Sequence, residues 1–400
     1  MKDVKIGKFT ISRDLLLFLI ANALLGVTLA IESTSFTNRL YEDLGFTITQ
    51  RGALEFPREL PGLLVVFIIA ALSFLGDVRT SGFANIFGGI GLIAFGLVPS
   101  GFWPVVVTMM IFSMGSHMYM PLQGSIAMTF AGKGNLGRRL GEIQAVNTIA
   151  LVLTTATLFI LFRFANISLS SVFVVGGVAM MLAGAVFFFM SPGHTTRGRK
   201  PKLIYRKKFI LFYLLSIFFG ARRQITFLFV AWLIVQGFGQ PVATMALLFF
   251  IMSVISIFFR PILGIFIDRM GERFVLVFEG ALLLLSCLGF AFAGTLFEHS
   301  TALIIVGVCF VIDNLFSIGA GMARTTYVRR LADDPEEISG TLAFSISLDH
   351  IFTMTLPFFG TILWEGTDYR YVFLVGALIS AACMFLANKI RVPESASSQK

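Results

Sequence analysis

Several ionisable residues lie deep inside long apolar stretches of the sequence, where a charge is costly and usually serves a function. They are Arg222, Arg223, Asp313, Asp349, His350 and His117. At about 1.5 Å of helix rise per residue, each lies near the middle of its stretch. A carboxylate beside a guanidinium stays charged, whereas an isolated buried carboxylic acid gains a proton. These residue types therefore predict reversible proton binding, with the arginines available for an anionic group.

We expect Asp313 to be the main proton-binding residue, with Asp349 as the second choice and His350 beside it. Arg222 or Arg223 would be the counter-ion of the acid, or would bind an anionic substrate group. Adjacent helical residues point about 100° apart, so only one of the two arginines is expected to face the substrate. The alternative is a static ion pair that only holds helices together.

Less strongly polar groups are also candidates for substrate contacts. We expect His117, Asn22 and Asn147 to contact the substrate, although each could equally form a hydrogen bond between helices. Methionines flank His117, but methionine is a common apolar filler, so no metal site is expected there.

These residues must be positioned by membrane-spanning helices. Hydrophobic residues make up 56% of the 400 residues and charged residues only 13%, compared with about 25% charged residues in soluble domains. A helix needs roughly 20 mostly apolar residues to cross a bilayer. We expect twelve such spans, at about 14–34, 55–75, 82–100, 104–130, 140–163, 170–190, 209–235, 242–263, 274–297, 301–325, 338–364 and 370–388.

Basic residues are concentrated in the segments that would lie on one side of the membrane. Most Lys and Arg residues fall at the chain ends and in alternate connecting segments, whereas most of the short connections between them have none. Cytoplasmic segments are enriched in these residues. We therefore expect a multi-pass protein of the plasma (inner) membrane with both termini in the cytoplasm, whose first apolar stretch is a retained helix and not a signal peptide.

A basic polar segment at 191–208 divides the sequence into two halves. We expect it to be a cytoplasmic linker between an N-terminal six-helix bundle, 1–190, and a C-terminal six-helix bundle, 209–400. The pentapeptide VFVVG at 172–176 opens the sixth span, and VFLVG at 372–376 opens the twelfth. Similar peptides at equivalent spans favour a duplicated six-plus-six architecture.

The segment between the eighth and ninth spans holds the most specific motif. It reads GIFIDRMGER, and the residues that define the motif are Gly264, Asp268, Arg269, Gly271 and Arg273. Gly264 would let a neighbouring helix approach closely. Gly271 suits a tight turn with positive φ. The segment resembles the signature loop of the major facilitator superfamily, G-x-x-x-D-R/K-x-G-x-R/K.

The corresponding loop of the first half reads SFLGDVR at 73–79. It keeps an acid at Asp77, but serine replaces the first glycine and the order of the basic residues differs. The resemblance implies that both loops act as a conformational latch, and Arg260 is close enough in sequence to be the partner of Asp268.

Charged residues also cluster near the expected outer ends of the first two spans. Glu32, Glu55, Arg58 and Glu59 could form an outer gate that ion pairs make and break. The alternative is a solvated cluster at two helix ends.

The resemblance implies an all-α integral membrane fold with 12 transmembrane helices in two pseudo-symmetric six-helix bundles. It also implies a central cavity that opens alternately to either side. The expected function is secondary active transport of a small organic solute, with protons as the coupling ion. The expected partners are this solute, protons and the lipid bilayer, and we expect a monomer. Alternatives are a lipid or lysolipid flippase of the same fold, or a transporter-like receptor that does not cycle.

Enzymatic and nucleic-acid functions are not indicated. The net charge of +9 lies in the segments that flank the spans and not in a binding patch. Cys287, Cys309 and Cys383 lie inside apolar stretches without the short spacing of zinc ligands. We find neither a phosphate-binding loop nor a nucleophile with a nearby base, so we expect no enzyme, no cofactor and no metal.

Overall fold

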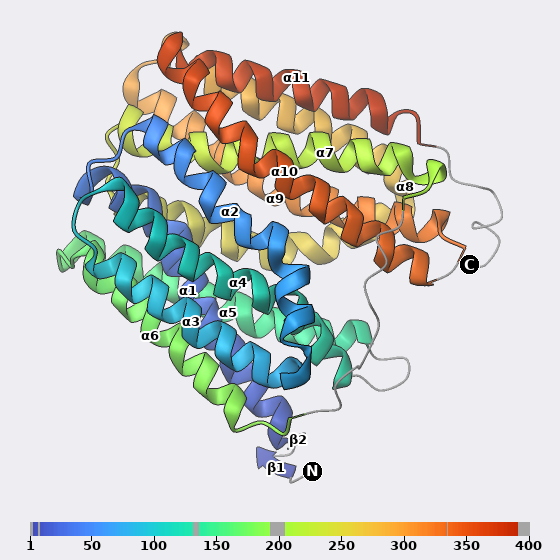
Figure 1. The fold of residues 1–400 in the computed structure, drawn as a ribbon. Helices are drawn as coiled ribbons and strands as arrows, with labels where there is room; N and C mark the ends of the chain where they lie inside the picture. The colour runs from blue at the N-terminus through green and yellow to red at the C-terminus, as the bar shows by residue number, and fades with distance from the viewer. Residues whose placement is uncertain (1–2, 7–8, 131–135, 193–204, 334, 391–400) are drawn as a thin grey trace. The chain divides into compact units, whose positions relative to one another are not determined.

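The computed structural model describes residues 3–6, 9–130, 136–192, 205–333 and 335–390, and these are mostly helical (Figure 1). A short antiparallel hairpin, β1 (Asp3–Ile6) and β2 (Phe9–Ser12), precedes the first helix. The Ser12 side chain caps that helix by accepting a hydrogen bond from the backbone N–H of Leu15. Most of the predicted linker, residues 193–204, lies outside the described residues.

The helices have the following bounds, in chain order: α1 (Arg13–Asn38), α2 (Ile48–Ala71), α3 (Asp77–Leu97), α4 (Phe102–Thr129), α5 (Leu136–Phe164), α6 (Leu169–Phe188), α7 (Ile210–Ile225), α8 (Val242–Leu296), α9 (His299–Leu331), α10 (Pro335–Gly366) and α11 (Tyr369–Ala387). Short π-helical segments follow two of them, namely η1 (Arg39–Asp43) after α1, and η4 (Thr226–Val230) and η5 (Leu233–Gly237) after α7. Short 3₁₀ turns are η2 (Ser73–Leu75) and η3 (Lys207–Phe209).

Ten helical stretches of the described chain are long and apolar enough to cross a membrane. One of them, α8, has 55 residues and joins two helices across a kink at Gly271. Helix α2 has 24 residues but carries several charged side chains, so it is not among the ten. Counting α8 as two spans and adding α2 raises the ten to twelve, which confirms the predicted number.

The predicted loop at 264–273 is wrong in its extent. Helix α8 continues through Asp268 to Met270, and only Gly271 leaves helical geometry, with φ +78° and ψ 160°. The residues from Gly264 to Met270 include no proline, so nothing in them prevents the helix from continuing. The connection between the two spans is therefore a single-residue kink.

Internal contacts divide the chain into two compact units. Unit 1 consists of Met1–Phe46, Pro57–Arg199 and Pro241–Ser253, and unit 2 consists of Thr47–Phe56, Lys200–Gln240 and Val254–Lys400. In both, the linker end is the end nearest the predicted linker, where α6 finishes in unit 1 and α7 begins in unit 2.

In unit 1, α3 packs against α4 and α6, and α1 packs against α5 and α6. Glycines let the backbones of α3 and α4 touch. A Cβ atom added at Gly115 would lie 2.4 Å from the carbonyl oxygen of Ala84 and 2.6 Å from Cα of Gly88. The polar residues carried by α1 and α4 are therefore held by a closely packed set of helices.

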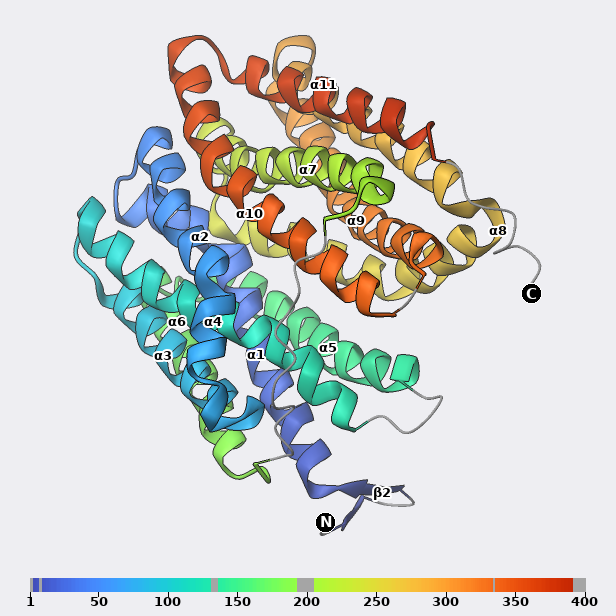
Figure 2. The ribbon, with the colours of Figure 1, turned by 45° about the vertical axis from the view of Figure 1, so that its right-hand side comes forward.

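In unit 2, α7 runs beside α10 and α11 (Figure 2). An apolar cluster that includes Phe209, Leu215, Leu276, Tyr327 and Val328 fills the linker end. Beyond this cluster, in its last turn, α7 carries two adjacent arginines, shortly before the π-helical segments that follow it. Wide turns of this kind occur frequently at functional sites.

Candidate functional site

The two arginines of α7 have opposite environments. Arg222 is 1% exposed, and its Nη1 lies 2.5 Å from Oδ1 of Asp313 on α9. Its Nη2 donates a hydrogen bond of 2.6 Å to the Ser317 hydroxyl. A buried ion requires such partners. Because these contacts surround Arg222 within unit 2, a solute cannot reach its guanidinium in this conformation.

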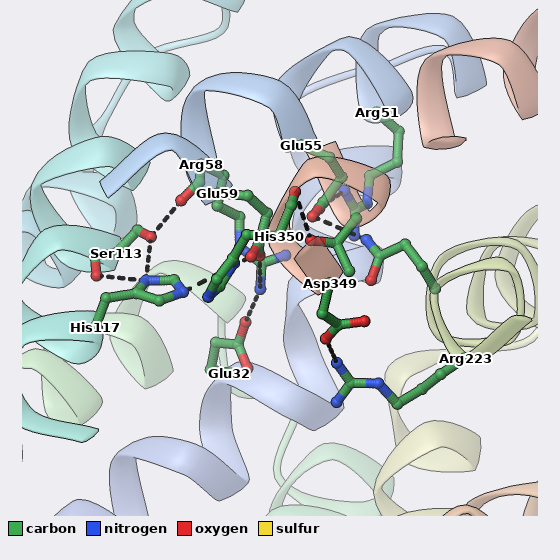
Figure 3. Close-up of polar contacts among 12 residues, drawn as sticks. Glu32, Arg51, Glu55, Arg58, Glu59, Ser113, His117, Arg223, Asp349 and His350 are labelled. Carbon is green, nitrogen blue, oxygen red and sulfur yellow. Dashed lines mark hydrogen bonds and ion pairs between the residues drawn. The ribbon is translucent and has the colours of Figure 1, made fainter. Parts of the chain in front are cut away.

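Arg223 is about half exposed, and its Nη2 lies 3.2 Å from Oδ2 of Asp349 on α10 (Figure 3). The carboxylate of Asp349 fits against α7 because residue 220 is glycine. A Cβ atom at Gly220 would lie only 1.5 Å from Oδ1 of Asp349. His350, the next residue of α10, is half-buried. Of the two arginines only Arg223 is exposed, and that it faces a substrate stays a prediction.

A second set of charged residues lies in unit 1. Arg58 Nη2 is 3.6 Å from Glu32 Oε1, and the Arg58 guanidinium lies over the ring of Phe36. Glu59, the next residue of α2, has its Oε2 3.7 Å from Nε2 of His117 on α4 (Figure 3). The structure thus joins residues that the sequence suggested separately for a gate and for substrate contact.

His117 is oriented by its own helix. Its Nδ1 lies 2.9 Å from the backbone carbonyl oxygen of Ser113. A carbonyl can only accept, so Nδ1 carries a hydrogen atom and Nε2 is the nitrogen that faces Glu59. His117 on α4 and Glu59 on α2 are therefore held against each other within unit 1.

The start of α2 corrects the expected position of the outer-gate residues, whereas their role as a gate stays a prediction. This helix begins at Ile48, and not near residue 55, so Arg58 lies about 15 Å along the helix and not at its end. Glu55 belongs to unit 2, where it pairs with Arg51 and accepts a hydrogen bond of 3.3 Å from Gln224. Hydropathy placed the start of this helix too late because Arg51 and Glu55 are charged, although both are buried as a pair.

Asn22 is fully buried in unit 1. Its Nδ2 donates to the carbonyl oxygen of Phe18 at 2.8 Å, and its Oδ1 accepts hydrogen bonds from Tyr119 and Gln123 of α4. Asn147 of α5 donates to the backbone oxygen of Asn22 at 3.3 Å. In this conformation these amides hold α1, α4 and α5 together, which was the alternative to substrate contact.

The motif at the α8 kink is only partly arranged as predicted. Gly271 has the expected positive φ, and Arg273 donates to the side chain of Asn388. Asp268 and Arg269 are exposed. No atom of the described residues lies within 4 Å of a Cβ added at Gly264, so the predicted close helix approach there is wrong. Arg260 precedes Asp268 by eight residues of unbroken helix, about 12 Å, so it is not a direct partner.

The two kinks have nearly the same backbone conformation. Gly76 has φ +77° and ψ 160°, which matches Gly271 within a degree. The acid after each glycine contacts the linker end of a neighbouring helix: Asp77 accepts from Ser125 of α4, and Glu272 lies 2.8 Å from Nε of Arg330 on α9. The structural equivalent of Asp77 is therefore Glu272, and not Asp268.

The end of the basic segment is fastened to the start of α10. Lys208 Nζ lies 2.7 Å from Asp333 Oδ2 and 2.6 Å from Glu337 Oε2, and Arg206 also pairs with Glu337. Hydrogen bonds from Lys208 hold the pKa of Glu337 and of Asp333 below their ordinary values. We call these four residues the linker clasp.

The linker clasp should stabilise the protein at neutral pH and fail in acid. A carboxylate whose pKa is lower in the folded state stabilises that state when the pH is above the pKa that the group has in the unfolded chain. For Glu337 this ordinary pKa is 4.5. This stabilisation is lost as the pH falls through the lower folded value. Glu337→Gln is therefore expected to lower the melting temperature at neutral pH, and the difference from the unmodified protein should shrink below about pH 4. A difference of constant size across this range would contradict the role of Glu337.

Sequence reasoning missed several charged residues that the structure places in contacts. Arg51 and Glu272 belong to the pairs described above. Glu279 of α8 is 2% exposed and accepts a hydrogen bond of 2.9 Å from the backbone N–H of Ala320. The sequence alone could have identified Glu279, because it is a single acid inside a long apolar run. The pairing of Glu272 depends on a residue distant in sequence, and that of Arg51 depends on a helix start that hydropathy missed.

Comparisons with known proteins agree on one family. The model of the Major Facilitator Superfamily matches residues 15–347. The vesicular acetylcholine transporter of Rattus norvegicus is 29% identical over 150 residues, which cover 37% of this chain and 26% of that protein. The corresponding probable transporter-A of Danio rerio is 27% identical over 141 residues, covering 34% and 25%. The match thus spans about a quarter of these relatives' length.

Solved structures share the fold at low sequence identity. A mutant of the nucleoside transporter NupG has a TM-score of 0.78 at 14% identity, covering 93% of this chain and 98% of that one. A bacterial homologue of the human lysosomal transporter Spinster, in an inward-facing and occupied conformation, has a TM-score of 0.70 at 15% identity, covering 94% and 96%. The xylose transporter XylE from E. coli has a TM-score of 0.68 at 11% identity, covering 95% and 99%.

Proposed function

Because the chain belongs to the Major Facilitator Superfamily, we propose that it moves a small organic solute across a membrane by alternating access, with protons as the coupling ion. The family and its solved neighbours are transporters and not enzymes, and the many apolar helices make this a multi-pass membrane protein. We further propose that it lies in the plasma membrane with both termini in the cytoplasm, as the distribution of basic residues predicts.

The half-exposed pair of Arg223 and Asp349 is the observation that carries this proposal. Arg223 lies near the middle of the apolar stretch Lys207–Gly237, and Asp349 lies well inside the stretch Gly340–Gly366. Transporters of this architecture bind substrate near the membrane midplane. A guanidinium has five N–H donors and binds carboxylates or phosphates through two parallel hydrogen bonds. Oδ1 of Asp349 has no hydrogen-bond partner among the described residues. The pair can therefore exchange its internal contact for contacts to a solute with an anionic group.

The buried residues have a different proposed role. Arg222 and Asp313 satisfy each other inside unit 2, so we assign them to the structure of the bundle in this conformation. In unit 1, Glu59 and His117 are the polar residues that we propose for solute or proton contact. The relatives' names include a nucleoside, xylose and acetylcholine, which supports a small organic solute as the substrate class.

A binding screen followed by uptake tests the proposed function. Purified protein would be melted with a nucleoside, a pentose, a quaternary ammonium compound and several carboxylic acids, since a bound solute raises the melting temperature. Stabilising solutes would then be tested for uptake into proteoliposomes with and without a pH gradient. A panel without any gradient-dependent uptake would count against transport and favour a protein that does not cycle.

Arg223→Gln is expected to weaken binding of the stabilising solute by roughly tenfold or more, because a hydrogen bond to a charged group is worth about 1.5–3 kcal/mol. Arg163→Gln is the matched control, because Arg163 is an exposed arginine at the end of α5. Equal affinities of Arg223→Gln and the control would remove Arg223 from the solute site.

A further inference from the structure

Glu279 lies on α8, eight residues beyond the left-handed turn at Gly271, or about 12 Å along the helix. It lines a pocket inside unit 2 to which α7, α8, α9 and α11 all contribute. Its neighbours in this pocket include Phe219, Arg222, Arg324 and Cys383, and the rest of the lining is largely apolar. An acid in this position is almost completely withdrawn from solvent.

The contacts of Glu279 differ from those of the other buried acids. Oε1 accepts the backbone N–H of Ala320, whereas Oε2 is buried without a hydrogen-bond partner in the described part of the chain. The other buried acids of the described chain each lie within 4 Å of a Lys or Arg nitrogen; these are Glu32, Glu55, Glu272, Asp313 and Glu337. Glu279 has no such ion pair.

The two arginines of the pocket are occupied elsewhere. Arg222 pairs with Asp313 and Ser317. Arg324 lies over the ring of Phe219, with its guanidinium carbon 4.0 Å from the ring centroid. Its Nε also donates to the carbonyl oxygen of Ala320 at 3.3 Å. Glu279 and Arg324 thus contact the same residue of α9, one at its N–H and the other at its carbonyl, without forming an ion pair.

An ionised carboxylate in this position would be a buried charge without a counter-ion, and such a group binds a proton instead. We propose that Glu279 is protonated in this conformation and is the site that carries the coupling proton; the second part of this proposal rests on the proposed transport function. The charged or titratable groups that face it are Arg222 from α7, Arg324 and Asp313 from α9, and Cys383 from α11.

Release of the proton changes the partner of Arg324. The O–H bond of Glu279 breaks, the proton passes to water, and the carboxylate that remains attracts the guanidinium of Arg324. Arg324 then leaves the ring of Phe219 on α7 and forms an ion pair with Glu279 on α8. Protonation of Glu279 is thereby linked to the contact between α7 and α9, and α7 also carries Arg223 of the proposed solute site.

Infrared titration of the purified protein in nanodiscs tests proton binding with the proton itself as the probe. Unmodified protein should show the C=O stretching band of a protonated carboxylic acid at neutral pH, where glutamate in water is ionised. Raising the pH should abolish this band. Glu279→Gln should lack it, because glutamine keeps the acceptor for Ala320 N–H but binds no proton. Asp349→Asn, which alters a half-exposed paired acid, should retain it.

The absence of the band at neutral pH, or its survival in folded Glu279→Gln, would overturn the proposal. A second measurement tests the coupling role. In proteoliposomes, Glu279→Gln should exchange solute at the rate of the unmodified protein but lose the acceleration that a pH gradient gives. Full retention of that acceleration would overturn the coupling role. The infrared result does not depend on transport, so failure of the proposed function and failure of the proton site are distinguishable.

Discussion

Asp313→Asn destabilises the protein by about 3–5 kcal/mol, because it leaves the Arg222 guanidinium buried without its counter-charge. The two side chains are 1% and 3% exposed, and their closest atoms lie 2.5 Å apart. Asparagine can keep a hydrogen bond but cannot neutralise the arginine. The expected result is a large loss of resistance to unfolding, measured by denaturant titration in mixed micelles.

Asp349→Asn is the matched control for this prediction. The same substitution is made in a pair that also joins α7 to a neighbouring helix, but Arg223 and Asp349 are 52% and 28% exposed. Ion pairs with this exposure contribute about 0–1 kcal/mol, so the loss should be small. The double substitution Arg222→Met with Asp313→Leu should recover most of the stability, because it leaves no unpaired charge. Equal losses from the two asparagine variants would contradict the assignment of Arg222 and Asp313 as a buried structural pair.

Gly115→Ala is expected to destabilise unit 1 by about 1–3 kcal/mol through overpacking. The added Cβ would meet backbone atoms of α3 at 2.4–2.6 Å, namely the Ala84 oxygen and the Gly88 nitrogen and Cα. Backbone atoms cannot move aside as the end of a side chain can, so α3 and α4 must separate. The change is measured as a lower melting temperature of the purified protein.

Gly124→Ala on the same helix provides the comparison. Within the described part of the chain, no atom lies within 4 Å of a Cβ added there. Alanine favours a helix over glycine by about 1 kcal/mol, so this variant should be as stable as the unmodified protein or slightly more stable. A Gly115→Ala protein that melts at the same temperature as Gly124→Ala would show that α3 and α4 are not packed as closely as described.

The number of spans was predictable because crossing a bilayer requires a minimum apolar length. Hydropathy failed where charges neutralise each other within the protein. The start of α2 was placed too late, because Arg51 and Glu55 look like a helix end in sequence but are buried as a pair. The kink of α8 was drawn as a loop, because Asp268 and Arg269 are polar, although both are helical.

The candidate site was predictable as a set of residues but not as a set of pairs. Depth along a helix identified Arg222, Arg223, Asp313 and Asp349, because an ionisable residue within an apolar stretch is rare. Which arginine is buried depends on how α7 is rotated against α9 and α10, and the sequence contains no local signal for that rotation. Glu279 could have been identified by the same depth criterion.

The π-helical segments after Ile225 allow the end of this helix to rotate about its axis in a way that a regular α-helix cannot. Each wide turn holds an extra residue in the ladder of backbone hydrogen bonds. If one of these turns tightened to α geometry, everything beyond it would rotate by roughly 100°, the angle of one residue. Such a rotation would turn the residues after the π-helical segments about the helix axis, while the two arginines before these segments keep their positions.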